Sequence, residues 1–174
     1  EVQITWWVNI RFEKTFDDEF CQLLAQSGCI AVTGGLETAS DRLLKKMSKG
    51  VDIGQVARVG QAFAKSGIMV HAYLMFGFPT QTSQETLDSL EVVRQLFLNG
   101  CIQSAFWHQF STTAHSPVGK NPEAFGIEIA GPEFQGFAMN DLIHTDPQGT
   151  EHPQFSSGLN SALQSFMRGE GFNK

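Results

Sequence analysis

The sequence has no apolar run close to the roughly 20 residues that a membrane-spanning helix needs, and no secretory signal is recognisable. It also has little positive charge, because 12 Lys and Arg against 18 Asp and Glu give a formal net charge of −6. Non-specific binding to nucleic acid or to anionic membranes needs clustered Lys and Arg, so this composition argues against both. What remains is a 174-residue chain with an ordinary hydrophobic share of 41%, enough for one globular domain or a large part of one.

Cysteine is scarce, and its three copies form no pattern. Cys21, Cys29 and Cys101 are odd in number and widely spaced. Their spacing matches no zinc site, no redox motif and no disulfide framework. We therefore expect buried free thiols in a cytoplasmic protein.

Common enzyme motifs are missing as well. The absence of a G-x-S-x-G elbow, a P-loop and a G-x-G-x-x-G turn weakens the hydrolase, NTPase and dinucleotide-binding hypotheses. No histidine shows H-x-x-x-H spacing or an adjacent acidic partner, so no metal ligand is predicted. A metal-dependent barrel hydrolase that uses the histidines stays a minor alternative. The histidines are His71, His108, His115, His144 and His152.

The most informative stretch spans residues 68–82 and reads IMVHAYLMFGFPTQT. Its first nine residues favour a strand that is long enough to cross a sheet. Within it, His71, Tyr73 and Met75 alternate with apolar residues, so one face is polar or polarisable and the other is apolar.

This strand is followed by a loop and a helix. Pro79 cannot extend a strand ladder, and Gly77 permits backbone conformations that other residues resist. Thr82 and Glu85 then form a T-x-x-E capping box. A strand, a Gly/Pro loop and a helix are the unit of an α/β barrel or a doubly wound sheet, in which ligands bind at this end of the strands.

The same unit recurs along the chain and predicts an α/β fold: a partial TIM-type barrel of about four parallel strands with crossover helices. The expected strands are residues 3–12, 29–37, 68–76 and 102–112. The expected helices include one capped by Thr15, one capped by Asp52, and one over residues 83–98 that turns Leu87, Leu90, Val93 and Phe97 inward.

The regular spacing of apolar residues is lost near Ser116. Residues 1–115 are predicted to form a half-barrel, and residues 116–174 a loop-rich extension with a short helix at 159–167. The chain starts at Glu1, inside a strand-like run, so we expect a domain cut from a longer protein. Open sheet edges in such a domain favour dimerisation or another covering.

Glu37 and Lys49 are the first candidates for chemistry. Glu37 lies at the carboxyl end of a strand, on the face that carries Gly35, and Lys49 follows twelve residues later. Together they could hold a zwitterion, although a surface ion pair is the simpler interpretation. For Tyr73 and Met75, the simpler interpretation is that their side chains pack inside a barrel.

Two segments resemble a known family. GGLETASDRLLKKMSKG at residues 34–50 and YLMFGFPTQT at residues 73–82 look like the second half of a radical S-adenosylmethionine (SAM) core. The resemblance covers roughly residues 4–125 and is closest to the branch associated with cobalamin-binding domains, where "G-x-E-[ST]" and "G-x-P-x-[EQ]-T" motifs recur at this separation.

The resemblance implies a set of cofactor-binding residues. Glu37 matches a polar residue that contacts SAM after the fourth barrel strand, and Lys49 matches a basic residue that meets the methionine carboxylate. Tyr73 and Met75 match positions near the ribose and adenine, although Tyr73 replaces an acidic or small polar residue of some relatives. The full set is Gly35, Glu37, Lys49, Tyr73, Met75 and Gly77, and no catalytic residue is assigned.

One family motif is absent. The C-x-x-x-C-x-x-C loop that ligates the [4Fe–4S] cluster does not occur here, and in the family it follows the first strand. We expect its ligands upstream of this chain, which alone would be inactive. The resemblance implies reductive cleavage of SAM to a 5′-deoxyadenosyl radical that abstracts hydrogen from an unknown small-molecule substrate, with room for cobalamin in the longer protein. The open alternative is a non-catalytic half-barrel that binds a ligand or dimerises.

Overall fold

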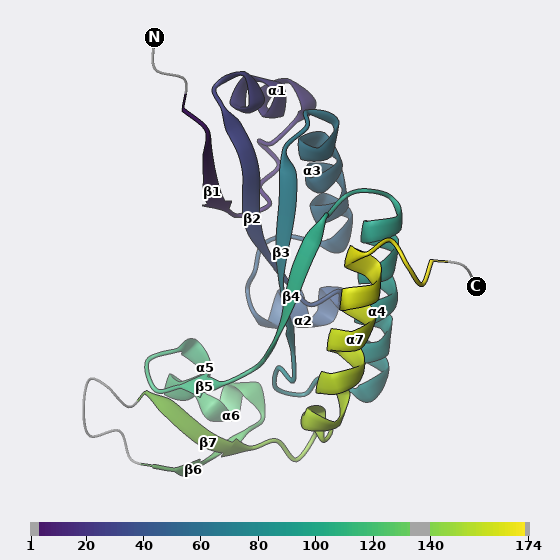
Figure 1. Cartoon of the computed structure of the whole chain (residues 1–174). Helices are drawn as coiled ribbons and strands as arrows, with labels where there is room; N and C mark the ends of the chain where they lie inside the picture. Colours follow the sequence, from purple (N-terminus) through teal and green to yellow (C-terminus); the bar gives the residue numbers. More distant parts are fainter. Residues whose placement is uncertain (1–3, 133–139, 173–174) are drawn as a thin grey trace.

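An open, four-stranded parallel sheet dominates the computed structural model, which describes residues 4–132 and 140–172 (Figure 1). Its strand order follows the chain, β1-β2-β3-β4. Crossover helices connect the parallel strands, as such pairs require. The predicted α/β partial barrel is confirmed, and the described strands do not close into a full one. The elements are β1 (Trp6–Ile10), α1 (Asp18–Gln26), β2 (Cys29–Glu37), α2 (Asp41–Lys46), α3 (Ile53–Lys65), β3 (Met69–Phe76), α4 (Ser83–Leu98) and β4 (Ser104–Gln109).

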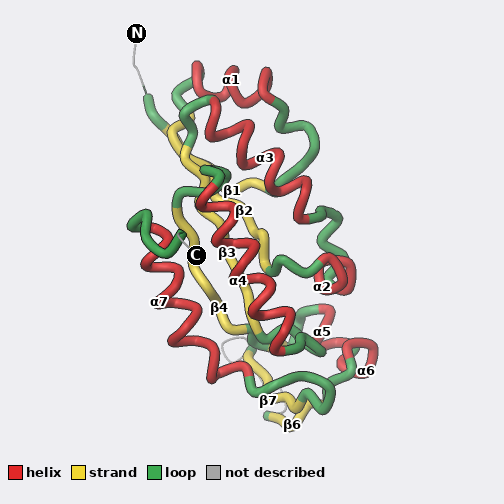
Figure 2. Tube along the Cα trace, turned by 90° about the vertical axis from the view of Figure 1, so that its right-hand side faces the viewer, coloured by secondary structure: helices red, strands yellow, loops and turns green. Residues whose placement is uncertain are grey.

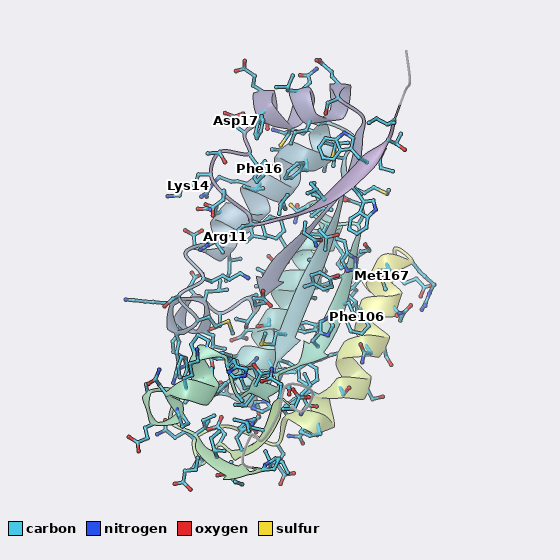
Figure 3. All side chains as sticks on the ribbon, turned by 90° about the vertical axis from the view of Figure 1, so that its left-hand side faces the viewer. Arg11, Lys14, Phe16, Asp17, Phe106 and Met167 are labelled. Carbon is cyan, nitrogen blue, oxygen red and sulfur yellow. The ribbon has the colours of Figure 1, made fainter. Side chains whose placement is uncertain are left out.

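The long helices cover one face of this sheet and leave the other open. Figure 2 views the sheet from the side of α3 and α4, and Figure 3 views it from the opposite side. Alternation along the strands decides which face is covered, because Val32, Leu36, Val70 and Leu74 are all essentially inaccessible. The opposite face of β3 carries the predicted His71, Tyr73 and Met75.

Side-chain caps start the principal helices. Asp52 accepts a hydrogen bond from the backbone N–H of Gln55, and Thr82 and Glu85 form the predicted capping box at α4. The prediction for α1 was wrong: its N-cap is Asp17, which accepts from the backbone N–H of Phe20, and not Thr15. Asp17 satisfies the first-turn donors as Thr15 would have, but two residues later.

Two further expectations need correction. Leu87 does not face inward, because its side chain is 50% exposed, whereas Val93 is buried. The strand predicted over residues 102–112 ends at Gln109, and Thr112 belongs to a second sheet. The run of strand-favouring residues gave no sign of this change of sheet.

The second sheet is small, three-stranded and antiparallel, and the sequence pattern did not predict it. Its order is β5-β7-β6, so β7 lies in the centre (Figure 1). Short helices and strands alternate here without a long periodic signal, which explains why the sequence predicted a loop-rich extension over residues 116–174. The elements are β5 (Thr112–Thr113), α5 (Pro117–Lys120), α6 (Pro122–Phe125), β6 (Glu128–Gly131), β7 (Asp141–Thr145) and the 3-10 turn η1 (His152–Phe155).

Helix α7 (Ser156–Met167) returns to the first sheet, and it extends the predicted helix at 159–167 by three residues at its start. Leu159, Leu163 and Phe166 join the same buried cluster as Val70 and Trp107 of the parallel strands. The division at residue 115 into two units stays a prediction. Within the described residues, no helix is long and apolar enough to cross a membrane.

Candidate functional site

The carboxyl end of β2 carries an ion pair that combines two of the predicted residues. Nζ of Lys49 lies 2.5 Å from Oε1 of Glu37, and the two side chains are 25% and 20% exposed. Glu37 has a φ of 66°, a left-handed conformation that non-glycine residues rarely adopt. Ser48, next to Lys49, is also left-handed at 53°, and the guanidinium of Arg11 donates to the backbone carbonyl of Lys49. Local backbone strain thus accompanies the pair on both sides.

Gly35 makes room for this ion pair. A Cβ atom at position 35 would overlap Oε1 of Glu37 and would lie 2.8 Å from Nζ of Lys49. The missing side chain is therefore what allows the two charged groups to lie over the sheet. We refer to Gly35, Glu37, Lys49 and Tyr73 as the rim.

Tyr73 lies beside Gly35 on the neighbouring strand. The register of the sheet pairs Gly35 with Tyr73 and Tyr73 with Phe106. The phenol ring is 43% exposed on the open face. Its centroid lies 5.3 Å from that of His71, in an edge-on contact, and 5.7 Å from that of His108. The rim therefore joins a charged pair to a cluster of aromatic rings that lie at steep angles to one another.

Met75 and Gly77, the other two predicted residues, continue β3 beyond Tyr73. Met75 packs against a small cluster that contains Leu43 and Phe78. Gly77 has a φ of 83°, and its backbone N–H donates to Oε1 of Gln81. A Cβ atom at Gly77 would lie 3.2 Å from the side chain of His152, so this glycine faces the C-terminal segment. The structure thus gathers Gly35, Glu37, Lys49 and Tyr73 and places Met75 and Gly77 next along the strand.

Several residues that hold the loop after β3 were not predicted. Gln81 is fully buried and accepts from the N–H groups of both Gly77 and Phe78. Thr80, left-handed with a φ of 71°, donates its N–H to the carboxylate of Asp146, 2.7 Å away. The sequence offered only the Gly/Pro loop itself as a signal, because Asp146 is distant along the chain.

Glu85 ties this loop to α2. Its two carboxylate oxygens accept from Nε and Nη2 of Arg42 at 2.8 and 2.7 Å. The hydrogen bonds from Arg42 lower the pKa of Glu85 to about 2, burial opposes the shift, and the backbone N–H of Thr82 and the Ser40 hydroxyl favour it. Arg42 also donates to the backbone carbonyl of Thr80, so one guanidinium joins α2, the loop and the start of α4.

The remaining predictions concern histidine and cysteine. Cys21, Cys29 and Cys101 are free and buried, as expected, and burial raises the pKa of each thiol, that of Cys21 to about 11. Nδ1 of His71 lies 2.8 Å from the hydroxyl of Ser104, and burial lowers the pKa of His71. Across residues 4–132 and 140–172, no group of three or more His, Cys, Asp or Glu side chains is placed to hold a metal ion.

Fold and rim together define a partial α/β barrel with charged and aromatic groups at the carboxyl ends of its strands. The family model of the radical SAM superfamily matches residues 8–93. Residues 8–93 therefore belong to the radical SAM superfamily.

Solved structures agree on the fold. The radical SAM methyltransferase TsrM from Kitasatospora setae, with cobalamin and a [4Fe–4S] cluster bound, superposes with a TM-score of 0.64 at 17% identity, over 92% of this chain and 36% of that chain. Coproporphyrinogen III oxidase (HemN) from Escherichia coli superposes with a TM-score of 0.56 at 11% identity, over 79% of this chain and 35% of that one.

Among curated proteins, an uncharacterized methyltransferase of Pyrococcus horikoshii is 26% identical over 95 residues, which are 55% of this chain. The present chain spans only 20% of that relative's length.

Proposed function

We propose that the rim binds SAM as part of a radical SAM enzyme. The observation that carries this proposal is the Glu37–Lys49 pair over Gly35, one strand away from the exposed Tyr73. The ammonium of Lys49 would take the methionine carboxylate and the carboxylate of Glu37 a hydrogen-bond donor of the cofactor. Tyr73 and Met75 would lie against the nucleoside, and Gly77 would let the loop approach it closely. The charged ends of the Glu37 and Lys49 side chains occupy the space above Gly35, so both would contact a group bound there.

A reduced [4Fe–4S] cluster would supply the electron that cleaves SAM, and the bound cofactor would then support hydrogen abstraction from a small-molecule substrate. The residues of this chain would orient the cofactor rather than reduce it. Cys21, Cys29 and Cys101 are at most 5% exposed and belong to the helix-side core, so none of them can ligate a cluster on the open face. Cluster ligands would come from outside these 174 residues. The chain alone should release no 5′-deoxyadenosine from SAM under reducing conditions, and measurable release would contradict this assignment.

Relatives suggest an outcome for the chemistry. One curated relative is named a methyltransferase, and the TsrM structure holds cobalamin. Methyl transfer with cobalamin bound by another part of the full protein is therefore the first outcome to test. The three free thiols support a reducing compartment such as the cytoplasm.

Binding of SAM is tested by replacing Lys49. Lys49→Met keeps the length of the side chain and removes its charge, and we expect at least about tenfold weaker binding of SAM, as is usual when a charge-assisted contact is lost. The matched control is Lys65→Met, because Lys65 pairs with Asp18 at 2.9 Å on the helical side of the molecule. Calorimetric titration with SAM should separate the two variants. If the two variants bound SAM with equal affinity, Lys49 would not be part of the SAM site.

A non-catalytic half-barrel is the second candidate, favoured by exposed apolar side chains on the sheet. Trp7 on β1 and Phe106 on β4 are 65% and 50% exposed. A second copy could cover this face or pair with the edge of β1, so the chain would be a dimer. Light scattering should then give twice the monomer mass, and a monomer at high concentration would contradict it.

A further inference from the structure

A cavity beside Gly77 contains a buried histidine with no hydrogen-bond partner. It has a volume of about 330 Å³ and lies where the segment after β7 passes the carboxyl ends of β3 and β4 (Figure 1). Its walls include Gly77, Phe110, His144, Asp146, Glu151 and His152. We call it the His152 pocket. The volume is within the range of small-molecule sites and is far larger than a single water needs.

His152 makes this pocket unusual. The residue is only 8% exposed, and neither Nδ1 nor Nε2 has a partner among the described residues. Buried polar atoms are nearly always hydrogen-bonded, so a buried imidazole without partners indicates that something else supplies them. Burial lowers the pKa of His152; nearby Asp146 opposes the shift and His144 reinforces it. A neutral imidazole offers one acceptor and one donor.

The charges of the walls indicate which ligand would suit. Asp146 and Glu151 are carboxylates, and no Lys or Arg is among the described residues that line the pocket. Asp146 is held in place by the backbone N–H groups of Thr80, Gln148 and Gly149, and Glu151 is exposed at the surface. Nδ1 of His144 is engaged with the hydroxyl of Thr112. Acceptors and negative charge therefore dominate, which disfavours anions and favours an ammonium group.

An aromatic wall completes the pocket. Phe110 lies in edge-on contact with both Phe78 and His144, at 5.2 and 5.8 Å between ring centroids, so its orientation is fixed. An aromatic face attracts both apolar groups and cations. A matching ligand would place a ring against Phe110, a hydroxyl group at the imidazole of His152 and an ammonium group near the carboxylates.

We propose that the His152 pocket binds a small organic ammonium compound with a neighbouring hydroxyl group, such as an aryl amino alcohol. The imidazole of His152 would hydrogen-bond the amino alcohol, and the carboxylate of Glu151 would pair with its charge. The pocket stands on its own geometry and does not depend on SAM. Its assignment to the substrate, rather than to an unrelated ligand, rests on the proposed function, because Gly77 joins it to the strand of the rim.

The test uses 2-amino-1-phenylethanol as the probe and mandelate as its matched anion, since both carry the same ring and hydroxyl. We expect saturable binding of the amine by calorimetry and at least about tenfold weaker binding of mandelate, as electrostatic complementarity requires. His152→Phe keeps the pocket filled and removes both nitrogens, and it should weaken binding about tenfold. Glu151→Gln changes an exposed residue, so it should leave folding unchanged and weaken binding of the amine but not of mandelate.

The control variant is Glu128→Gln, an exposed carboxylate on β6 that does not line the pocket. It should bind the probe as the unchanged chain does. Absence of saturable binding, equal binding of mandelate, or unchanged affinity in both Glu151→Gln and His152→Phe would overturn the proposal. Binding of the amine without binding of SAM would contradict the proposed function and leave the pocket proposal standing. Binding of SAM without binding of the amine would contradict only the pocket proposal.

Discussion

Two adjacent glycines on β2 should respond in opposite ways to the same substitution. Gly34 and Gly35 point to opposite faces of the sheet, and neither has a positive φ, so alanine is sterically allowed by the backbone at both. A methyl group at Gly34 would lie 2.5 Å from the ring of Phe12, a fully buried side chain. A methyl group at Gly35 would meet the ends of the Glu37 and Lys49 side chains, which can move into solvent.

The expected magnitudes follow from these neighbours. Gly34→Ala forces a rigid ring to shift within a packed core, and such overpacking costs about 1–3 kcal/mol in the free energy of unfolding. Gly35→Ala loses a partly exposed ion pair, worth up to about 1 kcal/mol, and gains a similar amount from the stiffer unfolded chain. The net change in its free energy of unfolding should be within about 1 kcal/mol of zero. SAM binding should fall in Gly35→Ala, because the methyl group displaces both charged groups.

Urea denaturation and calorimetric titration with SAM measure the two effects separately. Gly34→Ala should unfold at a lower urea concentration than the unchanged chain. Its affinity for SAM in the absence of urea should be unchanged. Gly35→Ala should unfold normally and bind SAM at least about tenfold more weakly, as loss of a charge-assisted contact implies. If Gly35→Ala bound SAM as well as the unchanged chain, the space above Gly35 would not be part of a SAM site.

Two further predictions concern titratable groups. The pKa of Glu85 is lowered from 4.5 to about 2 in the folded chain, so its stabilising contribution is present above pH 4.5 and is lost as the pH falls towards 2. Because Arg42 is half-exposed, screening reduces this contribution to about 1–2 kcal/mol, and Glu85→Gln should flatten the acid limb of a stability–pH curve measured by urea unfolding; an unchanged acid limb would exclude this role. The three cysteines are buried and their pKa values are raised, so iodoacetamide at pH 8 should label them only after unfolding, and rapid labelling of the native chain would contradict their placement.

The parallel half of the fold was predictable because its signals are local and agree with one another. The strand at 29–37 and the helix at 83–98 match β2 and α4 in both bounds, since strand alternation and a capping box leave little choice of register. The cap of α1 was misplaced because Thr15 and Asp17 are both good caps, and only the path of the chain selects Asp17.

The second sheet could not be predicted, because its strands are short and pair across distant segments. β5 pairs with β7 through Thr112 and Leu142, thirty residues apart, and neither strand has a distinctive pattern. The same limit applies to the site. Glu37 and Lys49 could be proposed as a pair from their motif, whereas the contacts of Thr80 with Asp146 and of Gly77 with His152 depend on how β7 and η1 return to the rim.

The most direct test of a SAM-binding rim is a backbone amide NMR titration of this chain with SAM. One saturation curve should describe the amide chemical shifts of the rim residues Gly35, Glu37, Lys49 and Tyr73. The amide shifts of Gly54 and Lys65, on the helical side, should not change. Shifts confined to other parts of the chain, or none at saturating SAM, would contradict the existence of the site.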